Sequence, residues 1–184
     1  MLNNDSSSHS EPSERRERRI ILPTAFISAA AWLLLIALDL WTKSLAQNCL
    51  CGNEPIELIP GALELYYLQN TGAAFSLLEN AQWLFILIAA VVTVLIGAAL
   101  VRVPKTRRYL PLAVSLLFIS SGAVGNLVDR IRLGYVRDFI YISLIHFPVF
   151  NVADMYVTIA TAALVLLVLF YYKDEDFAFL HAKG

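Results

Sequence analysis

The sequence has few of the side chains from which most catalytic and metal-binding sites are built. Among its 184 residues there are only two cysteines and three histidines. Cys49 and Cys51 are separated by one residue, which suits neither a metal site nor an easily formed disulfide, and we assign them no function. His9 and His181 lie in the terminal tails, and His146 is isolated. The HExxH motif of zinc proteases and the GxSxG motif of serine hydrolases are absent, so neither enzyme class is predicted.

Charge is scarce as well. Charged residues make up 16% of the chain and hydrophobic residues 58%, and the mean hydropathy is +0.64. Soluble domains contain about 45–50% apolar residues. Four apolar runs are each long enough for a membrane-spanning helix of about 17–25 residues, and they cover residues 20–38, 81–101, 109–128 and 149–172. The first run lacks a small-residue cleavage site and precedes three others, so we predict a retained helix rather than a signal peptide.

The basic residues predict how the chain faces the membrane. Ten of the 14 lysines and arginines lie in the N-terminal tail, in the connection after the second run, or at the C-terminus. An excess of basic residues marks the cytoplasmic side, so both termini are predicted to be cytoplasmic. The connections 39–80 and 129–148 then both lie on the outer face. This topology gathers the unusual polar residues of the chain into one layer near the outer membrane boundary.

Outside the four runs, the sequence predicts two tails and a small amount of outer structure. The Ser/Glu/Arg-rich tail 1–19 is expected to be disordered and cytoplasmic. Residues 20–173 form the membrane domain, and 174–184 form a cytoplasmic C-terminal tail. Residues 57–59 and 63–68 alternate like strands around Pro60-Gly61, which indicates a small sheet resting on the membrane. The apolar and aromatic segment 139–148 predicts an interfacial helix or loop. The fold class is thus mostly α, an integral-membrane four-helix bundle.

Two groups of polar residues lie at helix ends. Asp39 and Lys43 are four residues apart on one helical face, so they can form an ion pair that fixes the end of the first helix without touching a substrate. An ionisable residue at membrane depth costs about 2.5–3.5 kcal/mol on insertion scales, so a functional role is the alternative. Both readings stay open for this pair.

The end of the third helix carries the second polar group. Asn126, Asp129 and Arg130 follow the spacing i, i+3, i+4 and share one face. Gly122 and Gly125 are about one turn apart and allow another helix to approach closely. Either Asp129 and Arg130 form a buried network that holds helices together, or they act on a substrate directly.

Asp138 and Asp154 flank a short connection that leaves and re-enters the same side of the membrane. Both carboxyl groups therefore lie near the outer boundary and can meet across the bundle, with Asn151 one helical turn from Asp154. Ionising two carboxyl groups that lie close together is unfavourable because the two negative charges repel. The pKa of one group therefore rises, and the pair titrates as a unit. The result is one base and one acid, as in aspartic proteases: the base takes a proton from water and the acid protonates the leaving nitrogen. Structural pairing and a proton relay remain alternatives.

Two other classes of membrane protein account for the sequence less well than an enzyme. A proton-coupled transporter or channel places acids through the depth of the membrane. Here the acids cluster at one face, and the cytoplasmic halves of the spans lack them. A non-catalytic scaffold leaves two separate Asp motifs at opposite ends of one short connection unexplained.

Five motifs resemble those of one family in order and spacing. They are LDLWTK (38–43), NTGAAFS (70–76), GAVGNLVDR (122–130), VRDF (136–139) and FNVAD (150–154). On these motifs the chain resembles the lipoprotein signal peptidases, or signal peptidase II, of the bacterial cytoplasmic membrane, over about residues 25–172. The resemblance implies four spans, cytoplasmic termini, a small outer β-cradle and a short outer connecting helix over the active site.

The resemblance also implies an activity and its residues. The family removes signal peptides from prolipoproteins, cutting just before a cysteine that carries diacylglycerol, without a metal or organic cofactor and without a nucleic-acid partner. Its members are inhibited by globomycin-type cyclic peptides. The family's catalytic aspartates match Asp138 and Asp154. Its other motif residues match Asp39, Lys43, Asn70, Gly72, Asn126, Asp129, Arg130, Asn151 and Ala153. Among these, Asn70 and Arg130 are candidates to hold the substrate backbone or the developing oxyanion.

Two positions depart from the family pattern. Ser121 stands where many members have a second glycine before Gly122, and Arg137 precedes Asp138 where an apolar residue is common. An arginine at this position either lowers the pKa of the neighbouring carboxyl group or points at lipid headgroups.

Overall fold

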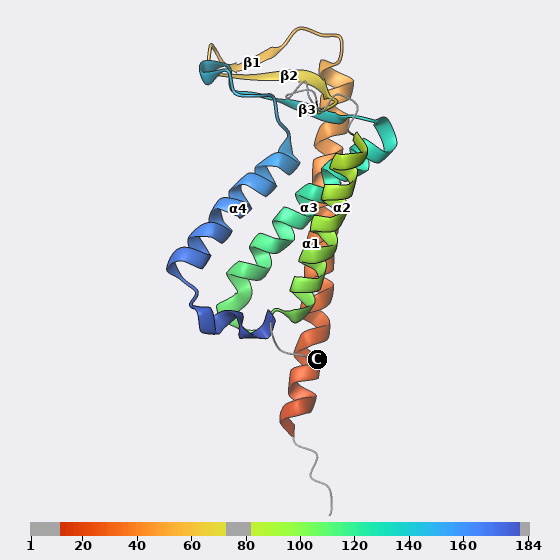
Figure 1. Ribbon diagram of the computed structural model, residues 1–184. Coiled ribbons are helices and arrows are strands. Elements are labelled where there is room, and N and C mark those ends of the chain that lie inside the picture. Colours follow the sequence, from red (N-terminus) through yellow and green to blue (C-terminus); the bar gives the residue numbers. More distant parts are fainter. Residues whose placement is uncertain (1–11, 73–81, 181–184) are drawn as a thin grey trace, which may run out of the picture.

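Four long helices dominate the computed structural model, which describes residues 12–72 and 82–180 (Figure 1). All four are long and apolar enough to cross a membrane, which confirms the four predicted spans. They are α1 (Pro12–Leu50), α2 (Gln82–Arg102), α3 (Leu110–Leu133) and α4 (Val152–Phe170). The strands are β1 (Ile56–Ile59), β2 (Leu63–Asn70) and β3 (Val136–Tyr141), and the 3-10 helices are η2 (Arg107–Tyr109), η3 (Ser143–Ile145) and η4 (Asp174–Leu180).

The first helix is longer than its apolar run at both ends. Helix α1 begins at Pro12, so residues 12–19 are helical where we expected a disordered tail. Proline is favoured in the first turn of a helix, because its missing N–H has no intrahelical partner there. At the other end α1 continues to Leu50 rather than stopping at residue 38. The chain stays helical there because Asp39 and Lys43 neutralise one another inside the bundle, with their charged atoms 2.8 Å apart.

The two predicted strands are confirmed, and a third strand completes the sheet. Strands β1, β2 and β3 pair in that order and are antiparallel. The third strand was not expected: the segment 139–148 begins within β3 and contains only the single turn η3. Residues 136–141 are mostly β-branched or aromatic, and pairing with β2 satisfies their backbone groups, which would otherwise lack partners. This pairing places Asp138 opposite Leu68.

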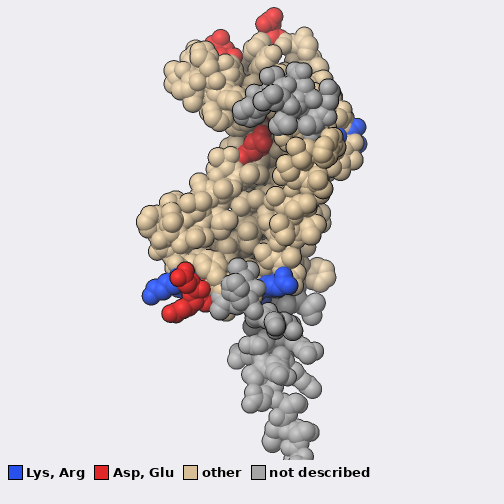
Figure 2. Space-filling view, in the orientation of Figure 1, with Lys and Arg blue, Asp and Glu red and all other residues tan. Residues whose placement is uncertain are grey.

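The sheet lies across one end of the helix bundle (Figure 1). Phe139 of β3 packs against Ala46 and Leu50 in the last turns of α1, which joins the sheet to the bundle. Figure 2 shows a broad uncharged band over the helices, with charged side chains at the sheet and at the opposite end. An acidic surface is also visible where the sheet meets the helices (Figure 2). The junction of sheet and bundle therefore combines polar groups with an apolar, membrane-type surface.

Glycines let three helices meet beneath the sheet. A Cβ atom placed on Gly122 would lie 2.5 Å from the backbone oxygen of Ala153 on α4. A Cβ atom on Gly125 would overlap the carboxylate of Asp39 on α1. These overlaps confirm the predicted close approach at the two glycines. Ser121, next to Gly122, is fully buried and donates a hydrogen bond to the backbone of Phe118.

The far end of the bundle is closed by residues near the C-terminus. Arg108 forms an ion pair with Asp176 of η4, and Tyr172 donates a hydrogen bond to the Arg108 backbone oxygen. Tyr172 also packs with Leu112 and Val103 in a small apolar cluster. Part of the predicted tail 174–184 is therefore folded against the helices, while residues 181–184 lie outside the described residues.

Candidate active site

Asp138 is held from two sides by asparagine amides. It lies in β3 and only 1% of its surface is exposed. Its Oδ2 atom accepts a hydrogen bond from Asn70 Nδ2 at 2.8 Å, and its Oδ1 atom accepts one from Asn151 Nδ2 at 2.6 Å. The backbone N–H of Gly72 donates to Asn70 Oδ1, which fixes the direction of that amide. Gly72 has φ +87°, a backbone conformation that favours glycine. These contacts fix the carboxyl group in one orientation.

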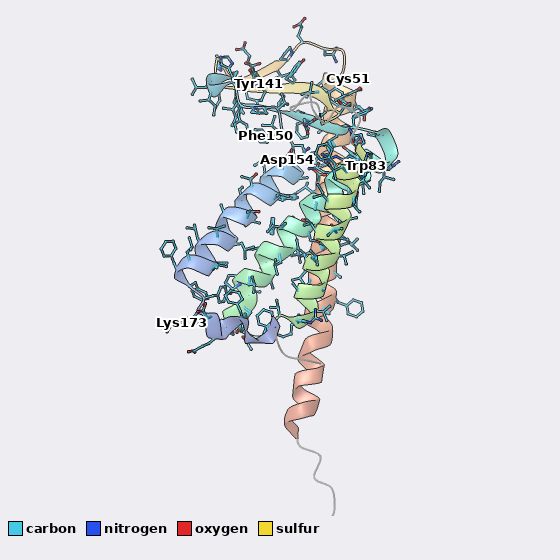
Figure 3. All side chains as sticks on the ribbon, in the orientation of Figure 1. Cys51, Trp83, Tyr141, Phe150, Asp154 and Lys173 are labelled. Carbon is cyan, nitrogen blue, oxygen red and sulfur yellow. The ribbon has the colours of Figure 1, made fainter. Side chains whose placement is uncertain are left out.

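Asp154 is held by the start of α4. Asn151 is the N-cap residue, and its Oδ1 atom accepts a hydrogen bond from the Asp154 N–H at 3.0 Å. In return Asp154 Oδ2 accepts from the Asn151 N–H at 3.1 Å, which completes a capping box. Asn126 Nδ2 donates to the other carboxylate oxygen of Asp154 at 2.7 Å. Figure 3 shows Asp154 at the end of α4 that faces the sheet, at the level of Trp83 on α2. The residue is half-buried and keeps access to the surface.

Asn151 and Asn126 bring the two carboxyl groups into one site. Asn151 Nδ2 donates both to Asp138 Oδ1 and, at 3.1 Å, to Asn126 Oδ1, while Asn126 holds Asp154. Burial raises the pKa of Asp138 to about 6; hydrogen bonds from Asn70 and Asn151 oppose this rise, and the negative charge of Asp154 adds to it. The two carboxyl groups therefore differ in environment, as a pair of one acid and one base requires.

The ion pair of Asp39 and Lys43 on α1 holds the residues that position the two aspartates. Both side chains are fully buried. Lys43 Nζ donates to Asn126 Oδ1 at 2.7 Å, and Asp39 Oδ1 accepts from the backbone N–H of Ala153 at 2.9 Å. Lys43 thus orients the amide that contacts Asp154, and Asp39 holds the first turn of α4. This geometry favours the positioning role over substrate contact for both residues.

Of the two alternatives for Asp129 and Arg130, the network between these neighbours does not form. Asp129 instead binds Arg137, with Nη2 at 2.7 Å from Oδ1 and Nε at 3.1 Å from Oδ2. Adjacent residues on a helix point in different directions, so Arg130 does not face its neighbour. Arg137 is only 9% exposed and does not point at lipid headgroups. It also donates to Gln47 Oε1 at 3.1 Å.

Arg130 faces a groove between α2, α3 and α4. Its guanidinium lies 5.2 Å from the centre of the Phe85 ring, a cation–π contact. The groove has a volume of about 300 Å³; Asn126, Arg130 and Asp154 line it together with apolar residues such as Val92 and Val157. An apolar segment can therefore lie between the helices with polar groups at its end.

Sequence reasoning missed Phe85 and Gln47, and it did not identify Asp129 and Gln47 as the partners of Arg137. Phe85 is one aromatic residue in an apolar run, and nothing in the sequence distinguishes it. Gln47 lies four residues after Lys43, so its position on the polar face of α1 could have identified it. Within residues 12–72 and 82–180, no cluster of three or more His, Cys, Asp or Glu residues could hold a metal ion.

The groove lies between membrane-spanning helices and is lined by Asp154, while Asp138 lies in β3 and is joined to Asp154 through Asn151. Fold and site together define a multi-pass membrane enzyme. Residues 31–170 match the family model described as signal peptidase (SPase) II. The match covers most of the chain, which therefore belongs to the signal peptidase II family and is a peptidase.

Individual relatives agree with this assignment. The chain is 40% identical over 160 residues to a lipoprotein signal peptidase of Streptococcus thermophilus (strain CNRZ 1066), covering 86% of this chain and 97% of the relative. It is also 40% identical over 147 residues to a lipoprotein signal peptidase of Streptococcus pyogenes serotype M5 (strain Manfredo), covering 79% of this chain and 92% of that protein. A solved bacterial membrane enzyme at 1.9 Å is similar with a TM-score of 0.68 and 27% identity, covering 79% of this chain and 94% of its own.

Proposed function

We propose that this protein is an aspartic endopeptidase that removes the signal peptide from diacylglyceryl-modified prolipoproteins, cutting immediately before the lipidated cysteine. The observation that carries the proposal is the placement of Asp138 and Asp154. Asn151 contacts both residues, Asn126 also holds Asp154, and Asp154 lines an apolar groove between membrane-spanning helices. The names of the relatives support prolipoproteins as the substrate class.

In the proposed reaction, Asp138 is the acid and Asp154 the base. The raised pKa of Asp138 favours its protonated form, and Asp154 is the less buried of the two. Ionised Asp154 takes a proton from a water molecule, whose oxygen attacks the scissile carbonyl carbon. Protonated Asp138 donates its proton to the nitrogen of the cleaved amide as the C–N bond breaks. No metal or cofactor is needed to balance these steps.

The groove suits a substrate that combines apolar chains with a peptide bond. Acyl chains or an apolar signal-peptide helix can lie against Val92 and Val157, while Arg130 reaches the polar end. The Nε atom of Arg130 is buried and has no hydrogen-bond partner among the described residues. A buried donor without a partner is unfavourable, so a substrate carbonyl oxygen is a suitable acceptor for it. We assign Arg130 and Asn70 to holding the substrate backbone.

We place the enzyme in the bacterial cytoplasmic membrane, with both termini in the cytoplasm and the site near the outer face. The distribution of lysine and arginine supports this orientation. The site lies beside the sheet, away from the end that carries Arg108 and Asp176. Globomycin-type cyclic peptides are expected to compete with the substrate for the groove.

The proposal is tested by incubating the purified full chain in detergent with a diacylglyceryl-modified prolipoprotein. Mass spectrometry of the product should show a new N-terminus at the lipidated cysteine. The matched control is the same precursor without the lipid, which should be cut much more slowly because the acyl chains contribute binding to the groove. Cleavage at another bond, or equal cleavage of both precursors, contradicts the proposed substrate.

The raised pKa of Asp138 predicts the pH dependence of cleavage. As the pH rises through about 6, Asp138 loses the proton that the leaving nitrogen needs, so kcat/KM should fall. Bound substrate excludes water from the site and raises this pKa further, so the fall in kcat should occur at higher pH than the fall in kcat/KM. The measurement is the initial cleavage rate across the pH range. A kcat/KM that keeps rising from about pH 5 to about pH 8 contradicts the assignment of Asp138 as the acid.

Thermal unfolding provides an independent control for this assignment. The pKa of Asp138 is raised from 3.8 to about 6 on folding, so the folded state binds the proton more tightly than the unfolded state. The contribution of this proton to the free energy of unfolding is fully present below pH 3.8, and it is lost as the pH rises through about 6. Asp138→Asn cannot titrate and should lack this loss.

A further inference from the structure

Four charged side chains form one buried network beneath the two aspartates. Lys43 lies 2.8 Å from Asp39 and 3.8 Å from Asp129, and Arg137 lies 2.7 Å from Asp129. Asp39 and Lys43 are fully buried, Asp129 is 1% exposed and Arg137 is 9% exposed. The network contains two acids and two bases, so its net charge is zero. Buried charges persist only when they are paired in this way.

The network contacts both halves of the proposed catalytic pair. At one end Lys43 holds Asn126 at 2.7 Å, and Asn126 holds Asp154 at 2.7 Å. At the other end Arg137 directly precedes Asp138 in β3. The backbone N–H of Arg137 also donates to Asp129 Oδ2 at 3.1 Å, which ties the strand to α3. Arg137 is therefore connected to Asp138 through the strand and to Asp154 through Asp129, Lys43 and Asn126.

We infer that Arg137 is a positioning residue, which balances the charge of this network and thereby keeps Lys43 on Asn126 and both aspartates in their working geometry. The inference rests on the proposed function, because it assumes that Asp138 and Asp154 perform the chemistry. The network joins α1, α3 and β3, and Gln47 of α1 supplies a further acceptor for Arg137 at 3.1 Å.

Loss of the Arg137 charge has a defined consequence. In Arg137→Met the network contains Asp39, Asp129 and Lys43, so its net charge becomes −1. Asp129 then has only Lys43 as a cation, at 3.8 Å, and this attraction competes with the hydrogen bond from Lys43 to Asn126. A freed Asn126 amide can rotate and withdraw its donor from Asp154. A small displacement at a catalytic group can lower the rate about a hundredfold.

The added negative charge also changes how tightly Asp138 holds its proton. The charged groups facing Asp138 are Lys43 of α1 and Asp154 of α4, with Arg130 and Asp129 on α3 nearby. Strand β2 contributes the uncharged Asn70, and the one charged residue of α2, Arg102, lies in its last turn. A net charge of −1 in this surrounding favours the protonated form of Asp138. The fall of kcat/KM that accompanies loss of the Asp138 proton should therefore occur at higher pH in Arg137→Met than in wild type.

The test measures kcat, KM and the pH profile of cleavage for five forms of the full chain. Arg137→Met should lower kcat about tenfold to a hundredfold, with KM changed less than about twofold, and move the fall of kcat/KM to higher pH. Asp129→Asn has the opposite effect on the charge of the network and should move this fall to lower pH. In Asp129→Asn/Arg137→Met the network is neutral again, so the fall should return to its wild-type position, with a higher kcat than in Arg137→Met. Arg132→Met removes an equal charge from the exposed last turn of α3 and should behave like wild type.

If Arg137 acts only by holding the strand and helices together, and its charge has no effect on the site, a different pattern is expected. The double variant would then be no more active than Arg137→Met, and the fall of kcat/KM would not move in opposite directions in the two single variants. Either result overturns the inference. If Arg137→Met does not fold, the comparison of Asp129→Asn with the double variant still tests the inference. Asp129→Asn should shift the pH profile of cleavage, and the double variant should not. If wild type cleaves, the Asp138 and Asp154 variants do not, and Arg137→Met matches wild type, the inference fails while the proposed function stands.

Discussion

Replacing Asp138 or Asp154 by asparagine is expected to lower kcat by about 10³-fold or more, because each variant removes one of the two proton-transfer groups. Asp138→Asn cannot supply a proton of comparable acidity, and Asp154→Asn cannot accept one from water. Each substitution has nearly the same shape as the native residue. Each also turns one carboxylate oxygen into an amide donor, so one of the two hydrogen bonds to Asp138 or to Asp154 is lost. A modest loss of stability should accompany the loss of activity.

The measurement is single-turnover cleavage of the diacylglyceryl-modified precursor, with folding checked by thermal unfolding in the same detergent. Asp174→Asn is the matched control, since Asp174 is exposed and lies at the opposite end of the molecule from the site. It should cleave at the wild-type rate. A folded Asp138→Asn or Asp154→Asn protein that cleaves within about tenfold of wild type would show that the carboxyl group is not a proton-transfer group.

The largest expected effect on stability follows the loss of the Lys43 charge. Lys43→Met leaves Asp39 fully buried with one remaining hydrogen bond, from the backbone of Ala153. Removing one partner of a buried ion pair typically lowers the free energy of unfolding by about 3–5 kcal/mol. Asn126 also loses the donor that orients it, so the loss of activity should exceed what the unfolded fraction explains.

Thermal and denaturant unfolding in detergent would measure this effect. Asp39→Asn/Lys43→Met should be more stable than Lys43→Met, because it leaves no unpaired buried charge from this ion pair. Lys105→Met removes an exposed lysine whose one hydrogen-bond partner among the described residues is the backbone of Leu100, and it should change stability by less than about 0.5 kcal/mol. Equal stability of Lys43→Met and wild type would show that Asp39 is protonated or solvated without its partner.

The two aspartates can be identified from the amino-acid sequence for a specific reason. They stand at the ends of one short connection between apolar runs, and the topology requires that connection to return to the same side. Their nearness therefore depends on chain connectivity and on the location of the runs, both of which can be read locally. Asn151 could be assigned to Asp154 for the same kind of reason, because one helical turn separates them.

The partners of Asp129 could not be assigned in this way. Spacing on the helix allowed a network with Arg130 as one of two alternatives, but the structure pairs Asp129 with Arg137. That pairing depends on β3, whose formation depends in turn on β2, a strand far away in the sequence. The unexpected strand and the wrong partner for Asp129 therefore have one cause: the edge of β2 selects the conformation of residues 136–141.

The sequence by itself determined the four spans, the two outer strands and the layer in which the polar residues gather, because hydrophobic length and alternation are properties of short stretches of chain. Only the tertiary structure decided how that layer is connected. Gly122 and Gly125 let α1 and α4 approach α3, which brings Asp39 and Lys43 to Ala153 and Asn126. A hydrogen bond forms only when two elements reach the right separation, and packing across the whole bundle sets that separation. The network that joins Arg137 to the site is therefore a property of the fold rather than of any motif.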